Sequence, residues 1–276
     1  VYADVTGTGE SVFDTALAIE IPTDGTVQLF DDTLYTDEVD TYSTRDVMVV
    51  VVFDTDENRN PGAKDTVSVR LVSQSADGQK ISVAGGGEDY STVVMPLLGR
   101  HQMENCAIAV AVVEELGSSA RLSVGGEAVR EGIRSVQWPG RCQVLSVDPL
   151  TILDGGHNPG AAEKLSRTIR DIAKKRPLGL VFGMCDDKDV NGFLGPFSEI
   201  VKACWAVTIR TERAVPRSQL AAAAGKFGWQ VREDDLPAAL VAARRWAVEN
   251  KGVVCIAGSL YLVGEVMELN NFRPFA

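Results

Sequence analysis

The stretch QVLSVDPLTILDGGHNPGAAEKLSRTIRDIAKKRPLGLVF, residues 143–182, decides the fold of the chain. Its apolar runs at residues 143–147, 152–153 and 178–182 have the length and composition of strands. Residues 159–176 have the spacing of a helix with one apolar face and a basic C-terminal end. The apolar positions are Ala162, Leu165, Ile169 and Ile172, and the basic ones are Lys174, Lys175 and Arg176. Strands that alternate with a helix predict a mostly parallel α/β sheet.

The same alternation extends to both sides of this stretch. Towards the C-terminus, residues 204–209 and 253–257 are further strand candidates, separated by helical stretches. Towards the N-terminus, apolar residues recur at helical spacing from Met103 to Leu116, and Gly117 ends the run. We therefore expect a buried helix there, followed by an α/β domain.

Residues 1–80 have a different pattern, in which apolar and polar residues alternate over short runs. The runs lie at residues 16–21, 26–30 and 66–72, and turn signals lie at Asp24-Gly25, Asn60-Pro61-Gly62 and Asp77-Gly78. This pattern predicts an all-β, sandwich-like segment. By composition, the segment loosely resembles acidic, Thr-rich Ig-like repeats of microbial surface proteins, with residues 47–53 and 66–72 as paired strands.

The charge divides the chain at the same place. Residues 1–80 hold 16 acidic and 5 basic residues, and residues 81–276 hold 22 of each, so the net charge of −11 belongs to the first part. Neither part has a basic surface for phosphates, which argues against a nucleic acid partner. No apolar stretch approaches the roughly 18 residues that span a bilayer, so we expect no membrane partner.

The 276 residues are enough for two folded units, and nothing in them indicates an oligomeric state. The five cysteines form no CxxC pair, which is typical of reduced thiols in a cytoplasmic domain. With His101 and His157 as the two histidines, no zinc centre is expected. Val1 is not a start residue and no targeting segment follows it, as in a fragment or a processed product.

The most specific local motif is DGGHNP, residues 154–159, at the junction of a predicted strand and a predicted helix. Ligands of open α/β sheets bind at this carboxyl edge. Asn158 can cap the helix with Pro159 at its first position, and the paired glycines let a ligand approach the backbone closely. Asp154 and His157 are the candidates for contact with that ligand. In the alternative, Asp154 only accepts hydrogen bonds from amides of its own loop.

Four other residues have both a functional and a structural interpretation. Ser259, at another strand-to-helix junction, suits a carboxylate or phosphate, or belongs to a tight turn. Gln102 and Asn105, one helical turn apart, can bind an adenine edge or serve as capping and surface residues. Arg141, after Trp138-Pro139-Gly140, is either a phosphate clamp or a solvated charge beside a hinge.

The segment from Asp54 to Asp65 places oxygen atoms at alternate positions, as in a calcium loop. Arg59 stands where such a loop requires glycine, so an Asx-rich turn is the alternative. The chain contains no GxxxxGK[ST] phosphate loop and no GxSxG nucleophile motif. The sequence therefore assigns no metal ligands, no P-loop and no serine nucleophile.

Five motifs in one order resemble a known family. They are PLLGRHQMEN at residues 96–105, WPGR at 138–141, LDGGHNP at 153–159, DKD at 187–189 and GSLYLVGE at 258–265. Together they resemble the C-terminal part of folylpolyglutamate synthase/dihydrofolate synthase, in the Mur ligase superfamily, over about residues 81–276. The resemblance implies the tail of an ATP-binding domain at residues 81–137 and a C-terminal Rossmann-like domain at residues 138–276.

That family joins L-glutamate to a folate or dihydropteroate carboxylate through an acyl phosphate formed from ATP. The resemblance implies these three compounds as partners, with Mg²⁺ as a cofactor whose ligands, like the P-loop and a modified lysine, precede the matched region. It implies the following contacts: adenine with Gln102 and Asn105, phosphates with Arg141 and His157, ribose with Asp154, and the glutamate carboxylate with Ser259. His157 and Asp154 are its catalytic candidates. Lys188 matches a family motif without a specific role, and Gly156 stands where the family usually has alanine.

The sequence thus predicts an all-β segment joined to the glutamate- and nucleotide-contacting part of an ATP-dependent ligase, unable to turn over alone. The alternative is a non-catalytic binding or structural protein that keeps the α/β fold without the reaction. We expect a cytoplasmic location for residues 81–276, whereas residues 1–80 have the composition of a surface protein.

Overall fold

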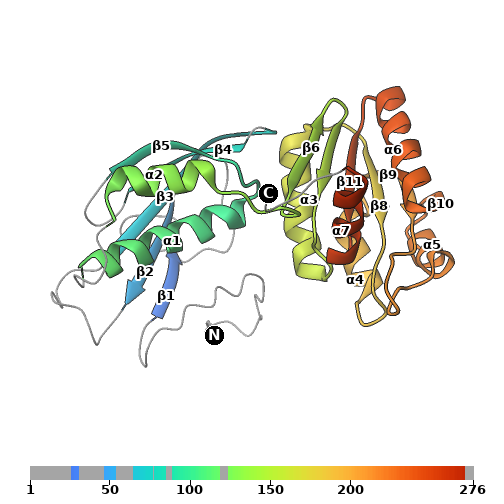
Figure 1. Ribbon diagram of the computed structural model, residues 1–276, viewed down its shortest axis with the longest axis horizontal. Coiled ribbons are helices and arrows are strands. Elements are labelled where there is room, and N and C mark those ends of the chain that lie inside the picture. Colours follow the sequence, from blue (N-terminus) through green and yellow to red (C-terminus); the bar gives the residue numbers. More distant parts are fainter. Residues whose placement is uncertain are drawn as a thin grey trace. The chain divides into compact units, whose positions relative to one another are not determined.

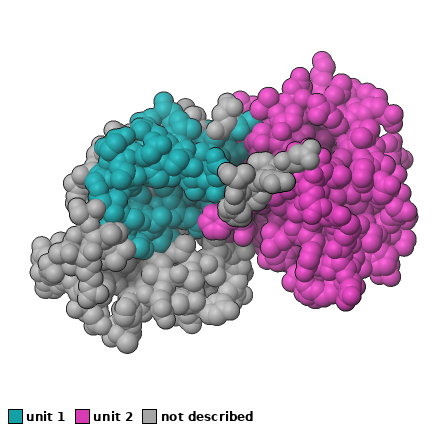
Figure 2. All heavy atoms as spheres, viewed as in Figure 1, with its two compact units in different colours: residues 1–137 teal, residues 138–276 magenta. Residues whose placement is uncertain are grey.

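The structure, a computed structural model, describes residues 26–30, 47–53, 65–76, 78–84, 89–118 and 124–270. The chain divides into two compact units, residues 1–137 and 138–276, which Figure 2 shows in different colours. Each unit contains its own β-sheet, so the structure of each can be followed separately.

The first unit contains a five-stranded antiparallel sheet with the strand order β1-β2-β3-β4-β5. Its elements are β1 (Thr26–Phe30), β2 (Val47–Phe53), β3 (Asp65–Ser75), β4 (Gly78–Ala84), β5 (Asp89–Met95), α1 (Arg100–Ser118) and α2 (Gly126–Ser135). Helices α1 and α2 pack against this sheet (Figure 1). The shared core includes Ile81 and Val93 from the sheet, Met103 and Ala107 from α1, and Ile133 from α2.

The strands predicted at residues 26–30, 47–53 and 66–72 are confirmed, and β2 pairs with β3 as expected. The strand predicted at residues 16–21 and most of the calcium loop, residues 54–64, lie outside the described residues.

The β-sandwich predicted for residues 1–80 is not shown. Among the residues that the structure describes, the sheet continues through β4 and β5 to Met95, and helices rather than a second sheet cover it. Alternation of apolar and polar residues indicates that one face of a strand is buried, but it does not indicate which element buries it.

The second unit contains a six-stranded sheet with the order β10-β9-β8-β11-β7-β6. Its elements are β6 (Gln143–Val147), β7 (Leu150–Leu153), α3 (Pro159–Ala173), β8 (Leu178–Phe182), α4 (Val190–Leu194), a short 3₁₀ turn (Gly195–Phe197), β9 (Val201–Ala206), α5 (Arg217–Gly225), β10 (Val231–Glu233), α6 (Leu236–Asn250), β11 (Val253–Ala257) and α7 (Leu260–Leu269). Neighbouring strands are parallel except β6 and β7, which confirms the predicted mostly parallel α/β sheet. Every residue of β8 and β11 is buried, as expected for central strands covered by helices on both faces (Figure 1).

The strands predicted at residues 143–147, 178–182 and 253–257 are observed with those bounds, but the strand predicted at 204–209 is β9, Val201–Ala206. The Val207 N–H still donates to Phe182 O at 3.0 Å, and the chain then leaves the sheet. Apolar residues beyond that point remain buried in the loop, so the apolar run extends further than the strand.

Helix α3 begins with the predicted chemistry but ends at Ala173, before the predicted Arg176, because Lys174 has a left-handed backbone. Asn158 Oδ1 accepts the Ala161 N–H at 2.8 Å, and Pro159 is the first helical residue. At the other end, Arg176 Nε donates to Ala173 O at 3.0 Å, where the helix exposes carbonyl groups. The Asn158 cap and Pro159 fix the point at which the chain leaves β7 and enters α3.

Candidate functional site

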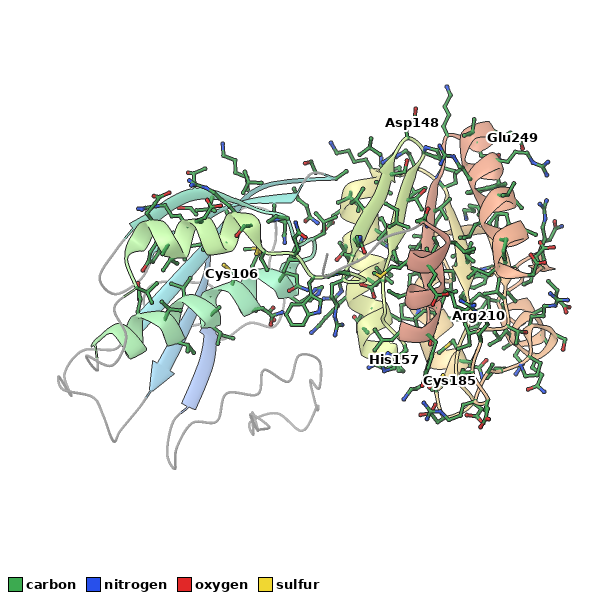
Figure 3. The ribbon with its side chains drawn as sticks, in the orientation of Figure 1. Cys106, Asp148, His157, Cys185, Arg210 and Glu249 are labelled. Atoms are coloured by element: carbon green, nitrogen blue, oxygen red, sulfur yellow. The ribbon has the colours of Figure 1, made fainter. Side chains whose placement is uncertain are left out.

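The candidate site lies at the carboxyl edge of the second sheet. Figure 3 shows His157, Cys185 and Arg210 at this end of the unit, in loops that follow β7, β8 and β9. Asp148 and Glu249 lie at the opposite end, where strands begin (Figure 3). The predicted motif is therefore at the edge where parallel strands present their loops to ligands.

Two close backbone contacts join the loops at this edge. The Gly258 N–H, after β11, donates to Gly156 O in the loop after β7 at 3.0 Å. A Cβ atom on Gly258 would lie 2.9 Å from Gly183 O in the loop after β8, and Gly258 has a φ of +112°. Only glycine satisfies both the space and the left-handed backbone at this position.

Asp154 connects the loop after β7 to the turn before β6. Its Oδ2 accepts the Cys142 N–H at 2.8 Å and its Oδ1 accepts the Gly156 N–H at 2.7 Å. The residue is 7% exposed. Burial raises the pKa of the carboxyl group, while these two N–H groups and the charge of Arg141 oppose the rise. Asp154 thus accepts from loop amides, as in its structural alternative, and the Cys142 side chain also interacts with the carboxylate.

Gly156 has no room for the alanine that the resemblance would place there. A Cβ on Gly156 would lie 2.7 Å from Asp154 Oδ1 and 3.2 Å from the Ala161 Cβ. The backbone of Gly156 is not in the left-handed region. An alanine at this position would therefore displace the Asp154 carboxylate, which gives a reason in space rather than in backbone freedom for glycine in this chain.

The His157 ring is half-buried and its Nδ1 lies 2.9 Å from Gly155 O. A carbonyl oxygen can only accept, so Nδ1 carries the proton and donates it. In the neutral ring, Nε2 is then the unprotonated nitrogen. His157 can accept a hydrogen bond or a proton at Nε2, and it can donate from Nε2 once protonated.

Ser259 is buried and caps α7, because its Oγ accepts the Tyr261 N–H at 3.1 Å. The hydroxyl proton is not used by this contact and can be donated to a carboxylate oxygen. The two interpretations offered for Ser259 are therefore compatible: the residue forms a tight turn and also presents a donor at a helix N-terminus.

Arg141 is exposed in a turn that is joined to the same edge. Its N–H donates to Trp138 O at 3.2 Å, and Gly140 O accepts the Gly155 N–H at 2.7 Å. The backbone of Arg141 is thus held beside the loop after β7, while its guanidinium group remains accessible to solvent.

Gln102 and Asn105 belong to the first unit and contact each other at the start of α1. Asn105 Nδ2 donates to Gln102 Oε1 at 2.9 Å, and Gln102 Nε2 lies 3.1 Å from His101 Nε2. Gln102 is buried, and Asn105 is half-buried. The predicted residues thus form two groups, this amide pair in the first unit and the loops around Asp154 in the second.

Gln79 in β4 holds the turn before α1, and the sequence contained no signal for it. Its side chain is 0% exposed, and its Nε2 donates to Leu97 O at 2.8 Å and to Gly99 O at 2.9 Å. Gly99 O also accepts the Gln102 N–H at 3.0 Å. A strand residue 23 positions before Gln102 therefore fixes the backbone from which Gln102 projects.

Two broader properties of the described part of the chain concern metal ions and membranes. Within it, no group of three or more His, Cys, Asp or Glu residues is placed to hold a metal ion. No helix among the described residues is long and apolar enough to cross a bilayer.

The comparisons with known proteins concern chiefly the second unit. Residues 140–260 match the family model "Mur ligase, glutamate ligase domain". A probable bifunctional folylpolyglutamate synthase/dihydropteroate synthase of Halobacterium salinarum is 34% identical over 182 residues, which are 65% of this chain and 21% of that protein. This chain therefore spans only a part of that relative.

Solved structures agree with this result. The folylpolyglutamate synthase of Mycobacterium tuberculosis complexed with ADP matches with a TM-score of 0.66 and 28% identity, over 75% of this chain and 48% of that one. The bifunctional enzyme of Yersinia pestis complexed with AMPPNP and a Mn ion matches with a TM-score of 0.57 and 28% identity, over 70% and 44%. The match to the Mycobacterium tuberculosis structure extends to residues before 81. It covers 75% of this chain, about 207 residues, whereas residues 81–276 are only 196.

These matches confirm the resemblance predicted from the five motifs, and they do not support the likeness of residues 1–80 to surface-protein repeats. Residues 140–260 match the model of the Mur ligase glutamate ligase domain, and the chain is similar to the C-terminal part of folylpolyglutamate synthase/dihydrofolate synthase.

Proposed function

We propose that this chain supplies the glutamate- and nucleotide-contacting part of an ATP-dependent ligase that joins L-glutamate to a folate or dihydropteroate carboxylate. One observation carries the proposal: within a matched glutamate ligase domain, hydrogen bonds join Asp154, Gly156 and Gly258 into one carboxyl-edge site that includes His157 and Ser259. In the reaction, the folate-side carboxylate attacks the γ-phosphorus of ATP and releases ADP. The glutamate amine then attacks the acyl carbon, loses a proton and expels phosphate.

The second unit would bind the phosphates and the glutamate. Arg141 presents an exposed guanidinium group that suits phosphate oxygens, and His157 presents Nε2. The Ser259 hydroxyl at the α7 N-terminus suits a glutamate carboxylate. Asp154 would accept from a ribose hydroxyl through a remaining lone pair while holding the loop in place. Fixed groups of this kind stabilise developing charge without reorganising during the reaction.

The first unit would bind the adenine. The Asn105 amide donates to Gln102, which orients both amides before a nucleotide arrives. The Asn105 carbonyl can then accept from the adenine amino group. In this proposal, residues 81–137 are the tail of the ATP-binding domain and residues 138–276 the C-terminal domain, in a cytoplasmic protein.

The metal would be bound by other residues of the ligase. The described part of this chain offers no cluster of metal ligands, and the family resemblance assigns the Mg²⁺ ligands to the region before the match. We therefore assign no step to a metal held by the residues described.

The second candidate function is a non-catalytic binding or structural protein that keeps the α/β fold without the reaction. Calorimetry of the whole chain with Mg-ADP and with L-glutamate separates the two functions. The ligase function predicts that both bind, and that His157→Ala weakens Mg-ADP binding about tenfold or more. Glu249→Ala, at the opposite end of the sheet, is the control and should leave both affinities unchanged. Absence of binding to folded protein would support the non-catalytic function.

A further inference from the structure

A residue in the loop after β9, Arg213, is tied to the candidate site through the loop after β8. The Asp186 N–H donates to Arg213 O at 2.8 Å, and the Val215 N–H donates to Met184 O at 2.9 Å. Cys185 and Ala214 form an antiparallel bridge between the same two loops. The backbone on both sides of Arg213 is therefore fixed by hydrogen bonds.

The loop after β8 in turn packs directly against the turn that contains Ser259. The absent Cβ of Gly258 would lie 2.9 Å from Gly183 O and 3.0 Å from Met184 Cγ. The loop after β8 thus contacts both the loop that contains Arg213 and the turn that contains Ser259, although Arg213 and Ser259 lie 46 positions apart in the sequence.

The Arg213 side chain reaches the same turn. Its Nη1 lies 3.6 Å from Asp187 Oδ2, and the nearby Tyr261 side chain and Asp187 both raise the pKa of the guanidinium group. The Tyr261 N–H is the donor that Ser259 Oγ accepts. Arg213 is therefore paired with Asp187 beside this turn, while 55% of its side chain remains exposed to an incoming ligand.

The local charge leaves Arg213 able to bind a carboxylate. Asp187 Oδ2 also contacts Lys188 Nζ at 2.9 Å, so one carboxylate is shared by two cations and the three side chains together carry a charge of +1. Because an Arg guanidinium has five N–H donors, its contact with one shared carboxylate leaves donors available.

Arg210, three residues earlier in the same loop, provides the contrast. Its Nε lies 3.1 Å from Glu265 Oε2, and its Nη2 pairs with Glu268 Oε2. Arg210 is paired with two carboxylates, so the three side chains together carry a charge of −1. Arg210 is exposed to a similar degree, 66%, but its guanidinium group is already neutralised.

We infer that Arg213 recognises the second carboxylate of the incoming glutamate and thereby selects a dicarboxylic amino acid over its amide. The inference rests on the proposed function, which places one glutamate carboxylate at Ser259. L-Glutamate and L-glutamine have nearly the same shape and differ in the charge of the side-chain end. A guanidinium group held at a fixed position binds a carboxylate through two parallel N–H donors and loses this interaction with an amide.

The test compares L-glutamate with L-glutamine on the whole chain, by calorimetry or ligand-observed NMR. The chain should bind glutamate at least about tenfold more tightly than glutamine. Arg213→Gln should lower the glutamate affinity about tenfold or more and leave glutamine and Mg-ADP binding unchanged. Arg213→Lys should restore part of the preference, because it keeps the charge but not the paired donors. Arg210→Gln is the matched control and should retain the preference.

The outcomes separate this inference from the proposed function. Glutamate preference that survives in folded Arg213→Gln protein overturns the role of Arg213 and leaves the proposed function standing. Equal loss in Arg210→Gln shows a general charge effect and also overturns the inference. A folded wild-type chain that binds neither Mg-ADP nor glutamate overturns the proposed function, and the inference with it.

Discussion

The two units hold their candidate ligand-binding residues in different ways. In the second unit, the buried carboxylate of Asp154 accepts N–H groups from two loops. In the first unit, the buried neutral amide of Gln79 donates to the two carbonyl groups before α1. Both side chains satisfy backbone groups, but without Asp154 two N–H groups would lose their acceptor, whereas without Gln79 the Gly99 carbonyl would keep the Gln102 N–H. The difference is that the carboxylate can change its charge with pH and the amide cannot.

The sequence provides a way to observe the units separately. All four tryptophans, Trp138, Trp205, Trp229 and Trp246, lie in the second unit. Tryptophan fluorescence therefore reports unfolding of that unit, whereas far-UV circular dichroism reports both.

The largest effect is expected for Asp154→Ala. It leaves the N–H groups of Cys142 and Gly156 buried without an acceptor, which should lower the free energy of unfolding by about 2–5 kcal/mol. Urea unfolding followed by tryptophan fluorescence measures the change, with Glu249→Ala as a surface control. A change no larger than that of the control would show that the carboxylate does not hold the loops.

Gly156→Ala should lower the free energy of unfolding by about 1–3 kcal/mol, because the added methyl group collides with Asp154 Oδ1. The matched control is Gly264→Ala in α7, where an added Cβ meets nothing within 4 Å. That change should stabilise the helix by about 0.5–1 kcal/mol. Both changes in the free energy of unfolding are measured by tryptophan fluorescence in urea. If both variants were stabilised or both destabilised, the explanation by a collision of the added methyl group would be wrong.

Gln79→Leu should lower the free energy of unfolding of the first unit by about 1–2 kcal/mol. The effect is smaller than that of Asp154→Ala because Gly99 O keeps the Gln102 N–H as a donor. The circular dichroism transition should move while the tryptophan transition stays in place. A shift of both transitions would show that the units unfold together, and would remove the basis for comparing them.

The smallest effect is the pH dependence of the second unit. Burial raises the pKa of Asp154 in the folded state, so the folded protein binds this proton more tightly than the unfolded one. The contribution of Asp154 to stability is therefore fully present below its ordinary pKa and is lost as pH rises through the raised value, by at most about 1.4 kcal/mol per pH unit. Unfolding in urea at several pH values measures it, and Asp154→Asn should flatten the slope of the tryptophan transition. An unchanged slope in that variant would assign the pH dependence to other groups.

The candidate site could be predicted from the sequence only where its chemistry is local. DGGHNP contains its own helix cap and first-turn proline, so the position and start of α3 followed from adjacent residues. The roles of Gln79 and Arg213 could not be predicted, because their partners lie 18 or more residues away and each contact exists only after two strands have been placed. The bounds predicted for β9 were also wrong, because the residues buried in the loop after it are as apolar as those of the strand.

By itself, the sequence determined the parallel α/β sheet, the N-terminal cap of α3 and the family resemblance, because periodicity, capping and short motifs involve neighbours in the chain. Only the tertiary structure decided that helices cover the first sheet, that Asp154 is buried between two loops, and that Arg213 lies beside the turn of Ser259. These features depend on contacts between residues distant in sequence, and such contacts form only when the strands are ordered in their sheets.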